Sequence, residues 1–374
     1  MTSRTPSTSP PPRPLAEAAP RAAADPGGGA QGGSRPGWRR WAVTLIGLAV
    51  SAAAILYVMQ SVDLERAGAV LAGADWRWLL AAFGVVPALM ALRGWRWQQI
   101  LPVADAARPS VPRVLVPLLV GNLANLVLPA RAGDPLRAYL LARRERMRFS
   151  GTLGSLALER AMDLATLAVI GLPAAVAANA VGWMVSGLAL LAVGGVVLTA
   201  LLVSPLVRHA VSAIAARPLI SRRRVTSRGV GVVLSFSEGA RGSGKRRVIG
   251  AIALSGLTWV VVAIAIWLAA RSLSISLDPA GAVVVAALTS LGTAIPSAPA
   301  AIGTYELAAV VAGHALGVAN AEALALGLVA HAVTTLPFVA AGGAALGLTS
   351  LGLGDIANGR AVQQAEIRLR RELG

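Results

Sequence analysis

The sequence predicts an all-α polytopic integral membrane protein with about six to eight transmembrane helices. Hydrophobic residues make up 56% of the 374 residues, and the mean hydropathy of +0.67 is too high for a soluble protein of this length. Several charge-poor runs approach the roughly 20 residues that a helix needs to span a bilayer. These runs are continuous rather than alternating, which disfavours a β-barrel.

Composition divides the chain into three parts. Residues 1–37 are rich in Pro, Ser, Ala and Gly and lack the apolar residues of a core, which predicts a disordered cytoplasmic tail. A transmembrane domain is expected over residues 38–350. Residues 351–374 are expected to form a basic cytoplasmic tail.

The basic residues predict the orientation in the membrane. The net charge of +17 is concentrated in arginine clusters between hydrophobic spans, which favours contact with anionic lipid over nucleic acid. By the positive-inside rule, both termini and the loop 208–247 lie in the cytoplasm, and Arg93 and Arg96 mark the return of the second span to that face. The Ala-, Arg- and Gly-rich usage is typical of a GC-rich bacterial genome, so the expected location is a bacterial plasma membrane.

Two apolar segments, 114–128 and 280–318, are too short or too interrupted for simple spans. If 114–128 crossed the membrane, the arginines that follow it would all face outside, so a re-entrant element from the cytoplasm is expected. Segment 280–318 must make an even number of crossings, either as a second re-entrant hairpin from the outside or as two short spans. Broken segments that enter from opposite faces would suggest an inverted repeat with a site near the midplane.

Residues 121–137 form the most unusual polar stretch. Asn122 and Asn125 stand at membrane depth, where lipid satisfies neither their donors nor their acceptors. Charged residues then follow at intervals of three, on one side of a helix. This pattern predicts a lined polar cavity near the membrane surface. The candidate residues are Asn122, Asn125, Pro129, Arg131, Gly133, Asp134 and Arg137.

A second charged cluster, Glu159, Arg160 and Asp163, lies inside a hydrophobic run. Each charge at the bilayer centre costs about 2.5–3.5 kcal/mol on insertion scales. Glu159 and Asp163 share a helix face, and Arg160 is spaced to pair with Asp163. Two interpretations remain open, namely a salt bridge that joins helices and a role in a polar pathway.

A third motif breaks the segment 280–318, with Pro299, Gly303, Tyr305 and Glu306 as candidate site residues. Glu306 either caps the following helix or acts as a gate or cation-pairing group that faces the polar elements near Asn122. Two intramembrane histidines, His314 and His331, are expected to bond a neighbouring carbonyl rather than relay protons.

The sequence contains no cysteine and no visible hydrolase triad, zinc motif, phosphate loop or dinucleotide fingerprint. No stretch outside the hydrophobic runs exceeds loop size. We therefore expect no catalytic residue, metal or cofactor, and no soluble enzymatic domain within these residues.

The three motifs together resemble those of the lysylphosphatidylglycerol synthase transmembrane-region family, also called flippase-like membrane proteins. The run 125–137 resembles its Asn-x-x-x-Pro-x-Arg-x-Gly-Glu-x-x-Arg signature, 159–163 its Glu-Arg-x-x-Asp element, and 299–306 its Pro-Gly-Gly-x-Gly-x-x-Glu element. Order and spacing agree over roughly residues 40–350. Asp134 replaces the usual Glu, and Ala300 and Ala301 replace the glycine pair, which predicts a stiffer break.

The resemblance implies a flippase-like domain that translocates or handles lipids, and it does not imply aminoacyl transfer, which resides in a separate domain in that family. The expected ligand is an anionic phospholipid or a polyprenyl-phosphate-linked head group. Arg131 and Arg137 would meet its phosphate, and Asn122 would line the path together with Asn125. Charge balance or proton acceptance would fall to Asp134, Glu159 and Glu306.

Two other functions remain open. The protein could be a membrane subunit that presents lipid to a separately encoded glycosyl- or aminoacyltransferase, or an intramembrane transferase. The sequence leaves the lipid, the direction and energy source of transport, and the oligomeric state undetermined.

Overall fold

A computed structural model describes residues 38–103, 108–128, 131–204 and 244–349, together with short stretches between 351 and 371. In these residues every regular element is a helix, which confirms the all-α prediction. The candidate Pro129, the predicted tail 1–37 and most of the basic loop and C-terminal tail lie outside the described residues. The boundaries proposed for those parts stay predictions.

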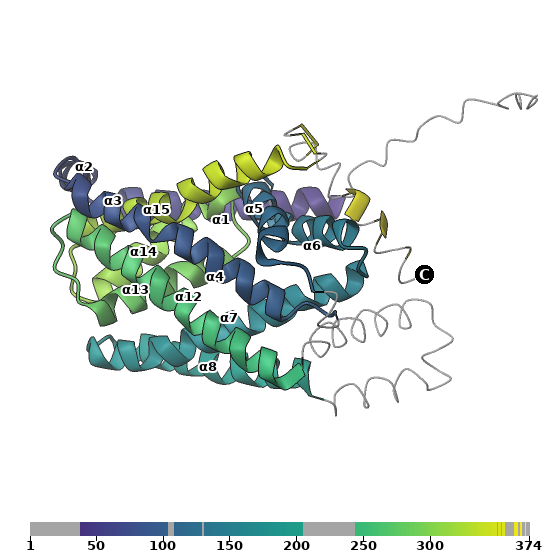
Figure 1. The fold of residues 1–374 in the computed structure, drawn as a ribbon. Coiled ribbons are helices and arrows are strands. Elements are labelled where there is room, and N and C mark those ends of the chain that lie inside the picture. Colours follow the sequence, from purple (N-terminus) through teal and green to yellow (C-terminus); the bar gives the residue numbers. More distant parts are fainter. Residues whose placement is uncertain are drawn as a thin grey trace, which may run out of the picture.

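Six helical segments of the described part are long and apolar enough to cross a membrane. They run side by side as a bundle (Figure 1). Five are single helices, and the remaining one joins two helices at Val85. The six are α1 (Trp38–Ser61), α3 (Trp76–Gly84) with α4 (Val86–Gln99), α7 (Phe149–Ala177), α8 (Gly182–Val203), α12 (Gly244–Ser272) and α15 (Asn320–Leu346).

A short helix, α2 (Leu64–Ala72), forms between the first two spans. Asp63 begins it, because the Asp63 carboxylate accepts the backbone N–H of Arg66 at 2.9 Å. Asp75 begins α3 in the same way through the Arg77 N–H at 2.8 Å. The two caps begin α2 and α3, so the second span starts soon after the first ends at Ser61.

The first short segment folds as the helix pair α5 (Val111–Val127) and α6 (Gly133–Arg144). Both helices lie in the half of the molecule that holds the end of α8 and the start of α12 (Figure 1). They cross so closely that a Cβ added to Gly133 would lie 2.0 Å from the Gly121 carbonyl oxygen. The pair therefore has the form expected of a re-entrant element, and its crossing requires glycine.

The second short segment folds as α13 (Pro279–Ala294), a single 3₁₀ turn η3 (Pro299–Ala301) and α14 (Thr304–Ala315). Figure 1 shows α13 and α14 in the opposite half of the bundle from α6. The turn η3 packs against α5, so the two broken segments meet inside the protein. This arrangement agrees with entry from opposite faces, whereas an inverted repeat stays a prediction.

Helix α1 covers the break at η3 from one side. The Ser51 hydroxyl accepts the backbone N–H of Ala298 at 2.8 Å, which satisfies a donor that lipid could not. A Cβ on Gly47 would lie 2.9 Å from the Ser297 carbonyl oxygen, so a larger residue would push α1 away. Elsewhere α1 exposes large apolar side chains such as Leu45 and Ile46, as a lipid-facing helix does.

The topology can be tested by labelling single cysteines, because the protein has none of its own. Arg143→Cys at the end of α6 and Ser276→Cys between α12 and α13 both replace exposed residues. A membrane-impermeant maleimide is expected to label position 276 from outside in intact cells, and position 143 only after the membrane is opened. Labelling of both positions from the same side would contradict the two-ended arrangement.

Candidate functional site

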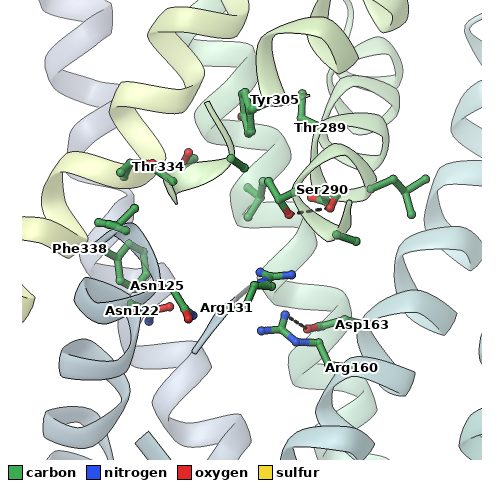
Figure 2. Close-up of a pocket in the computed structure, with 18 of the residues that line it drawn as sticks. Asn122, Asn125, Arg131, Arg160, Asp163, Thr289, Ser290, Tyr305, Thr334 and Phe338 are labelled. Atoms are coloured by element: carbon green, nitrogen blue, oxygen red, sulfur yellow. Dashed lines mark hydrogen bonds and ion pairs between the residues drawn. The ribbon is translucent and has the colours of Figure 1, made fainter. Parts of the chain in front are cut away.

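A cavity of about 610 Å³ lies inside the bundle where the two broken segments meet (Figure 2). Its walls come from α4, α5, α6, α7, α12, α13, α14 and α15, and from the residues around η3. The volume is within the usual range of small-ligand sites. Of the sequence-predicted residues, those that border it are Asn122, Asn125, Arg131, Arg137, Glu159, Arg160, Asp163 and Tyr305.

Arg96 lies at the centre of the buried charges. Only 2% of it is exposed, and its Nη2 donates to Glu159 Oε1 at 2.9 Å. Its Nη1 bonds the Asp163 carboxylate and donates to Ser255 Oγ on α12 at 3.2 Å. Arg96 is thus buried in the protein, where two carboxylates of α7 compensate its charge, and its role as a marker of the cytoplasmic face stays a prediction.

Arg137 joins the same cluster from α6. Its Nη2 donates to Glu159 Oε1 at 3.2 Å, and its Nε lies 3.3 Å from Asp134 Oδ1. The guanidinium carbon also lies 4.9 Å from the centre of the Trp97 ring, a cation–π contact. Arg137 is thus held on three sides, with only 4% of it exposed.

Arg160 completes the cluster, but with a different main partner from the one expected. Its Nη2 lies 2.8 Å from Asp134 Oδ2, whereas its Nη1 is 3.9 Å from Asp163 Oδ2. Spacing along one helix pointed to Asp163, but a carboxylate of α6 approaches more closely. We call the set of Arg96, Arg137, Arg160, Asp134, Glu159 and Asp163 the ionic network.

The ionic network agrees with both interpretations of the charged motif. It connects α4, α6 and α7 by ion pairs, as a packing salt bridge would. Arg160 and Asp163 also border the cavity, and Figure 2 shows both at its wall. The same charges therefore hold the helices together and line a polar space.

Two further arginines border the cavity without a carboxylate partner among the described residues. Arg131 follows the break after α5 and has a left-handed backbone with φ of 54°. Arg93 lies one helical turn before Arg96 on α4, and its guanidinium carbon is 5.3 Å from the centre of the Phe338 ring. The prediction used Arg93 as a topology marker and missed it as a site residue. Its position three residues from Arg96 inside an apolar run was the available signal.

Asn125 stabilises the break rather than simply lining the cavity. Its Oδ1 accepts the Gly133 N–H at 2.7 Å, and its Nδ2 donates to Asp134 Oδ1 at 3.3 Å. The amide thus satisfies a backbone donor at the start of α6 and positions a member of the ionic network. Asn122 lies one turn earlier on α5 and borders the cavity beside Asn125 (Figure 2).

Glu306 caps α14 and also pairs with a histidine. Its Oε2 accepts the Gly303 N–H at 2.7 Å, and its Oε1 lies 2.6 Å from His331 Nδ1. The Tyr305 ring stacks on the His331 ring, with centroids 4.3 Å apart. The capping interpretation therefore holds for Glu306. The partner of this carboxylate is His331, which borders the cavity, rather than a group near Asn122.

The match to known proteins agrees with this arrangement. The family model of the lysylphosphatidylglycerol synthase transmembrane region matches residues 44–342. The chain belongs to this family. The match includes all three polar motifs and both broken segments of the family member described here.

Two curated relatives are also similar to this family member. Glycosyltransferase AglD of Haloferax volcanii is 28% identical over 335 residues, which cover 80% of this chain and 53% of AglD. A UPF0104 membrane protein of Methanothermobacter thermautotrophicus is 34% identical over 115 residues, covering 30% of this chain and 32% of that protein. The chain thus spans about half the length of AglD and a third of the second protein.

The break at η3 keeps a left-handed backbone despite the two alanines that replace the family's glycines. Ala300 and Ala301 have φ of 60° and 58°, and Gly303 has φ of 90°. A left-handed residue with a Cβ costs roughly 1–2 kcal/mol relative to its right-handed form. The two alanines therefore keep the turn at η3, and their left-handed backbone is strained.

This strain generates a stability prediction. Ala301→Gly should raise the free energy of unfolding by about 0.5–1 kcal/mol, because relief of strain exceeds the added chain entropy. Ala53→Gly, at an exposed site on α1, should lower it by about 0.5–1 kcal/mol. Denaturant titration in mixed micelles measures both. A loss of stability in both variants would contradict the strained break.

The pairing within the ionic network generates a second prediction. Arg96→Met should destabilise the protein by about 3–5 kcal/mol, because it leaves buried carboxylates uncompensated. Adding Asp163→Asn should restore part of this loss. In the parallel cycle of Arg160→Met with Asp163→Asn, the losses should be closer to additive, since that contact is 3.9 Å long. Equal coupling energies in the two cycles would contradict the assigned pairs.

Proposed function

We propose that this protein moves lipids with an anionic or carrier-linked head group between the leaflets of a bacterial plasma membrane. The head group occupies the cavity while the acyl or prenyl chains stay in the surrounding lipid. One observation supports this most strongly. Arg93 and Arg131 border an internal cavity without a carboxylate partner among the described residues, at the place where two broken segments meet.

The charge of the site favours an anion. Inside the ionic network three guanidiniums face three carboxylates, so their charges balance. Arg93, which is half-buried, and Arg131, which is exposed, remain at the cavity without a carboxylate contact among the described residues, so an anion can approach both. A phosphate suits this role, because the planar guanidinium fork matches two phosphate oxygens.

We assign different roles to the two arginines that the sequence suggested for the phosphate. Arg131 keeps the proposed phosphate role. Arg137 is bound by Glu159 and Asp134 and packed on Trp97, so we assign it to positioning of the network. Asn122 remains a lining residue, and Asn125 supports the break.

The two broken segments support movement rather than static binding. In transporters, discontinuous helices that enter from opposite faces place a site near the midplane, and small shifts of either element change which face has access. Here η3 and the end of α5 both border the cavity. The Glu306–His331 pair lies beside η3 and is placed to balance charge or accept a proton when the head group enters.

A second candidate function is a membrane subunit that presents lipid to a separately encoded transferase. The name of the relative AglD, a glycosyltransferase, favours this alternative, since the match covers only 53% of that protein. In this case the cavity would hold the same head group without transfer between leaflets. Both candidates place the termini in the cytoplasm.

A transport assay separates the two candidates. The purified protein is reconstituted in liposomes, and movement of fluorescent phosphatidylglycerol between leaflets is followed by quenching of the outer leaflet. Arg131→Lys should leave folding intact but slow transfer about tenfold, because lysine keeps the charge and loses the fork. Glu306→Gln should also slow transfer, since glutamine can cap α14 but carries no charge toward His331.

Arg143→Lys, at an exposed site on α6, is the matched control and should transfer lipid at the parent rate. Monodispersity of each variant is checked before reconstitution. If Arg131→Lys and Glu306→Gln both matched the parent, the motifs would be structural supports. The lipid-presenting subunit would then be the better proposal.

A further inference from the structure

The cavity has two chemically different parts. In Figure 2, Arg131, Arg160 and Asp163 lie in the lower part, and the hydroxyl-bearing side chains Thr289 and Ser290 lie in the upper part, together with Tyr305 and Thr334. These hydroxyls come from α13, α14 and α15, whereas the charges come from α7 and from Arg131, two residues before α6. The proposed phosphate site therefore occupies only one end of the space.

The threonines at the upper end present acceptors to the cavity. Thr289 and Thr334 donate their hydroxyl protons to carbonyls of their own helices, at Val285 and Ala330, both at 2.7 Å. Thr258, which lines the cavity from α12, donates in the same way to the Leu254 carbonyl at 2.7 Å. The Tyr305 hydroxyl contacts both Thr289 and Thr334, and its single proton fills at most one of the lone pairs that these oxygens keep for an incoming donor. This end of the cavity is thus matched to a ligand that carries several O–H or N–H groups.

Trp259 lines the cavity and carries a buried donor. The indole N–H of Trp259 is buried and has no acceptor among the described residues. A buried donor of this kind costs about 1–3 kcal/mol when unpaired. A hydroxyl can both accept and donate a hydrogen bond, which neither an ammonium nor an apolar group can do. Hydroxyl groups therefore fit this end better than ammonium groups.

The net charge around the cavity also favours hydroxyl groups over ammonium groups. Five arginines border the cavity, namely Arg93, Arg96, Arg131, Arg137 and Arg160. Asp134, Glu159 and Asp163 balance three of them, which leaves an excess of two positive charges. Glu306 is engaged by His331 and the Gly303 N–H. A cationic aminoacyl head group would meet this excess of positive charge without a carboxylate to receive it.

We propose that the cavity is a two-part head-group site that selects a phosphate-linked polyol and rejects head groups with ammonium groups. Arg93 and Arg131 bind the phosphate, and the threonine oxygens with the Trp259 N–H bind hydroxyls of a glycerol or sugar attached to it. This inference rests on the proposed function, because it takes the cavity as the head-group site. It adds the ligand class and names Arg93 as a binding residue.

Binding of water-soluble short-chain lipids to the detergent-purified full chain tests the inference by calorimetry. The probes are dihexanoyl forms of phosphatidylglycerol, phosphatidate and lysyl-phosphatidylglycerol, and a short polyprenyl phosphohexose. Phosphatidylglycerol or the phosphohexose should bind about tenfold more tightly than phosphatidate, which lacks a polyol. Lysyl-phosphatidylglycerol should bind at least tenfold more weakly than phosphatidylglycerol. The stronger of the two polyol probes identifies a glycerol or a sugar as the preferred group.

Variants separate the two ends of the site. Arg93→Gln and Arg131→Gln should weaken all phosphate-bearing probes about tenfold, and Arg93→Lys should fall between Arg93→Gln and the parent. Thr289→Val and Thr334→Val should weaken the polyol probes about fivefold and leave phosphatidate unchanged. Arg143→Gln on the surface and Thr199→Val on α8 are the matched controls and should bind like the parent. Thr199 also donates to a carbonyl of its own helix, at Gly195.

Two results would overturn the inference. One is tighter binding of lysyl-phosphatidylglycerol than of phosphatidylglycerol, and the other is equal loss for phosphatidate and polyol probes in the threonine variants. Failure of the proposed function has a different signature, because the parent would then bind the polyol probes with this selectivity yet transfer no lipid in liposomes. Absence of binding to every probe would overturn both proposals.

Discussion

The compensation of buried charge is the constraint on which the rest of the structure depends. Six ionisable side chains of the ionic network lie inside an apolar bundle, where each isolated charge is expensive. The network avoids this cost because every guanidinium contacts at least one carboxylate, and Glu159 serves two of them, Arg96 and Arg137. Helices α4, α6 and α7 are therefore fixed relative to one another by ion pairs as well as by packing. Arg93 and Arg131 are not part of this network, and both border the cavity.

The backbone breaks obey a related constraint. A helix that ends at membrane depth leaves N–H groups that lipid does not satisfy. Asn125 accepts the Gly133 N–H at one break, and Ser51 and Glu306 accept those of Ala298 and Gly303 at the other. These side chains make irregular backbone tolerable in the interior. They also explain why polar residues cluster where the chain turns back, beside the cavity.

Much of the fold follows from local sequence. Span length and arginine distribution predicted the six long helices and the two short broken segments, because hydropathy and loop charge act over neighbouring residues. The polar motifs were found in the same way, and most of their residues border the cavity or join the ionic network. The left-handed backbone of Ala300 and Ala301 could not be predicted in this way. Packing by α1 and α5 holds a conformation that alanine alone disfavours.

The pairings could not be predicted in the same way. Spacing of three residues suggested Arg160 with Asp163, yet Asp134 from another helix approaches Arg160 at 2.8 Å. Arg96 resembled a surface arginine because its partners Glu159 and Asp163 lie more than sixty residues away in the sequence. Glu306 on α14 pairs with His331 on α15, and local spacing does not show this pair because the two residues are 25 positions apart. Which charges remain unpaired, and hence which arginines are free for a ligand, depends on the three-dimensional arrangement.

The most direct measurement of the central claim is an experimental structure of the full protein, in nanodiscs, with short-chain phosphatidylglycerol present in excess. We expect head-group density inside the cavity, with the phosphate against Arg93 and Arg131 and the glycerol toward Thr289 and Thr334. We also expect that this density disappears in Arg131→Gln while the helices keep their positions. Head-group density confined to the outer surface of the bundle, with the cavity unchanged, would contradict the account.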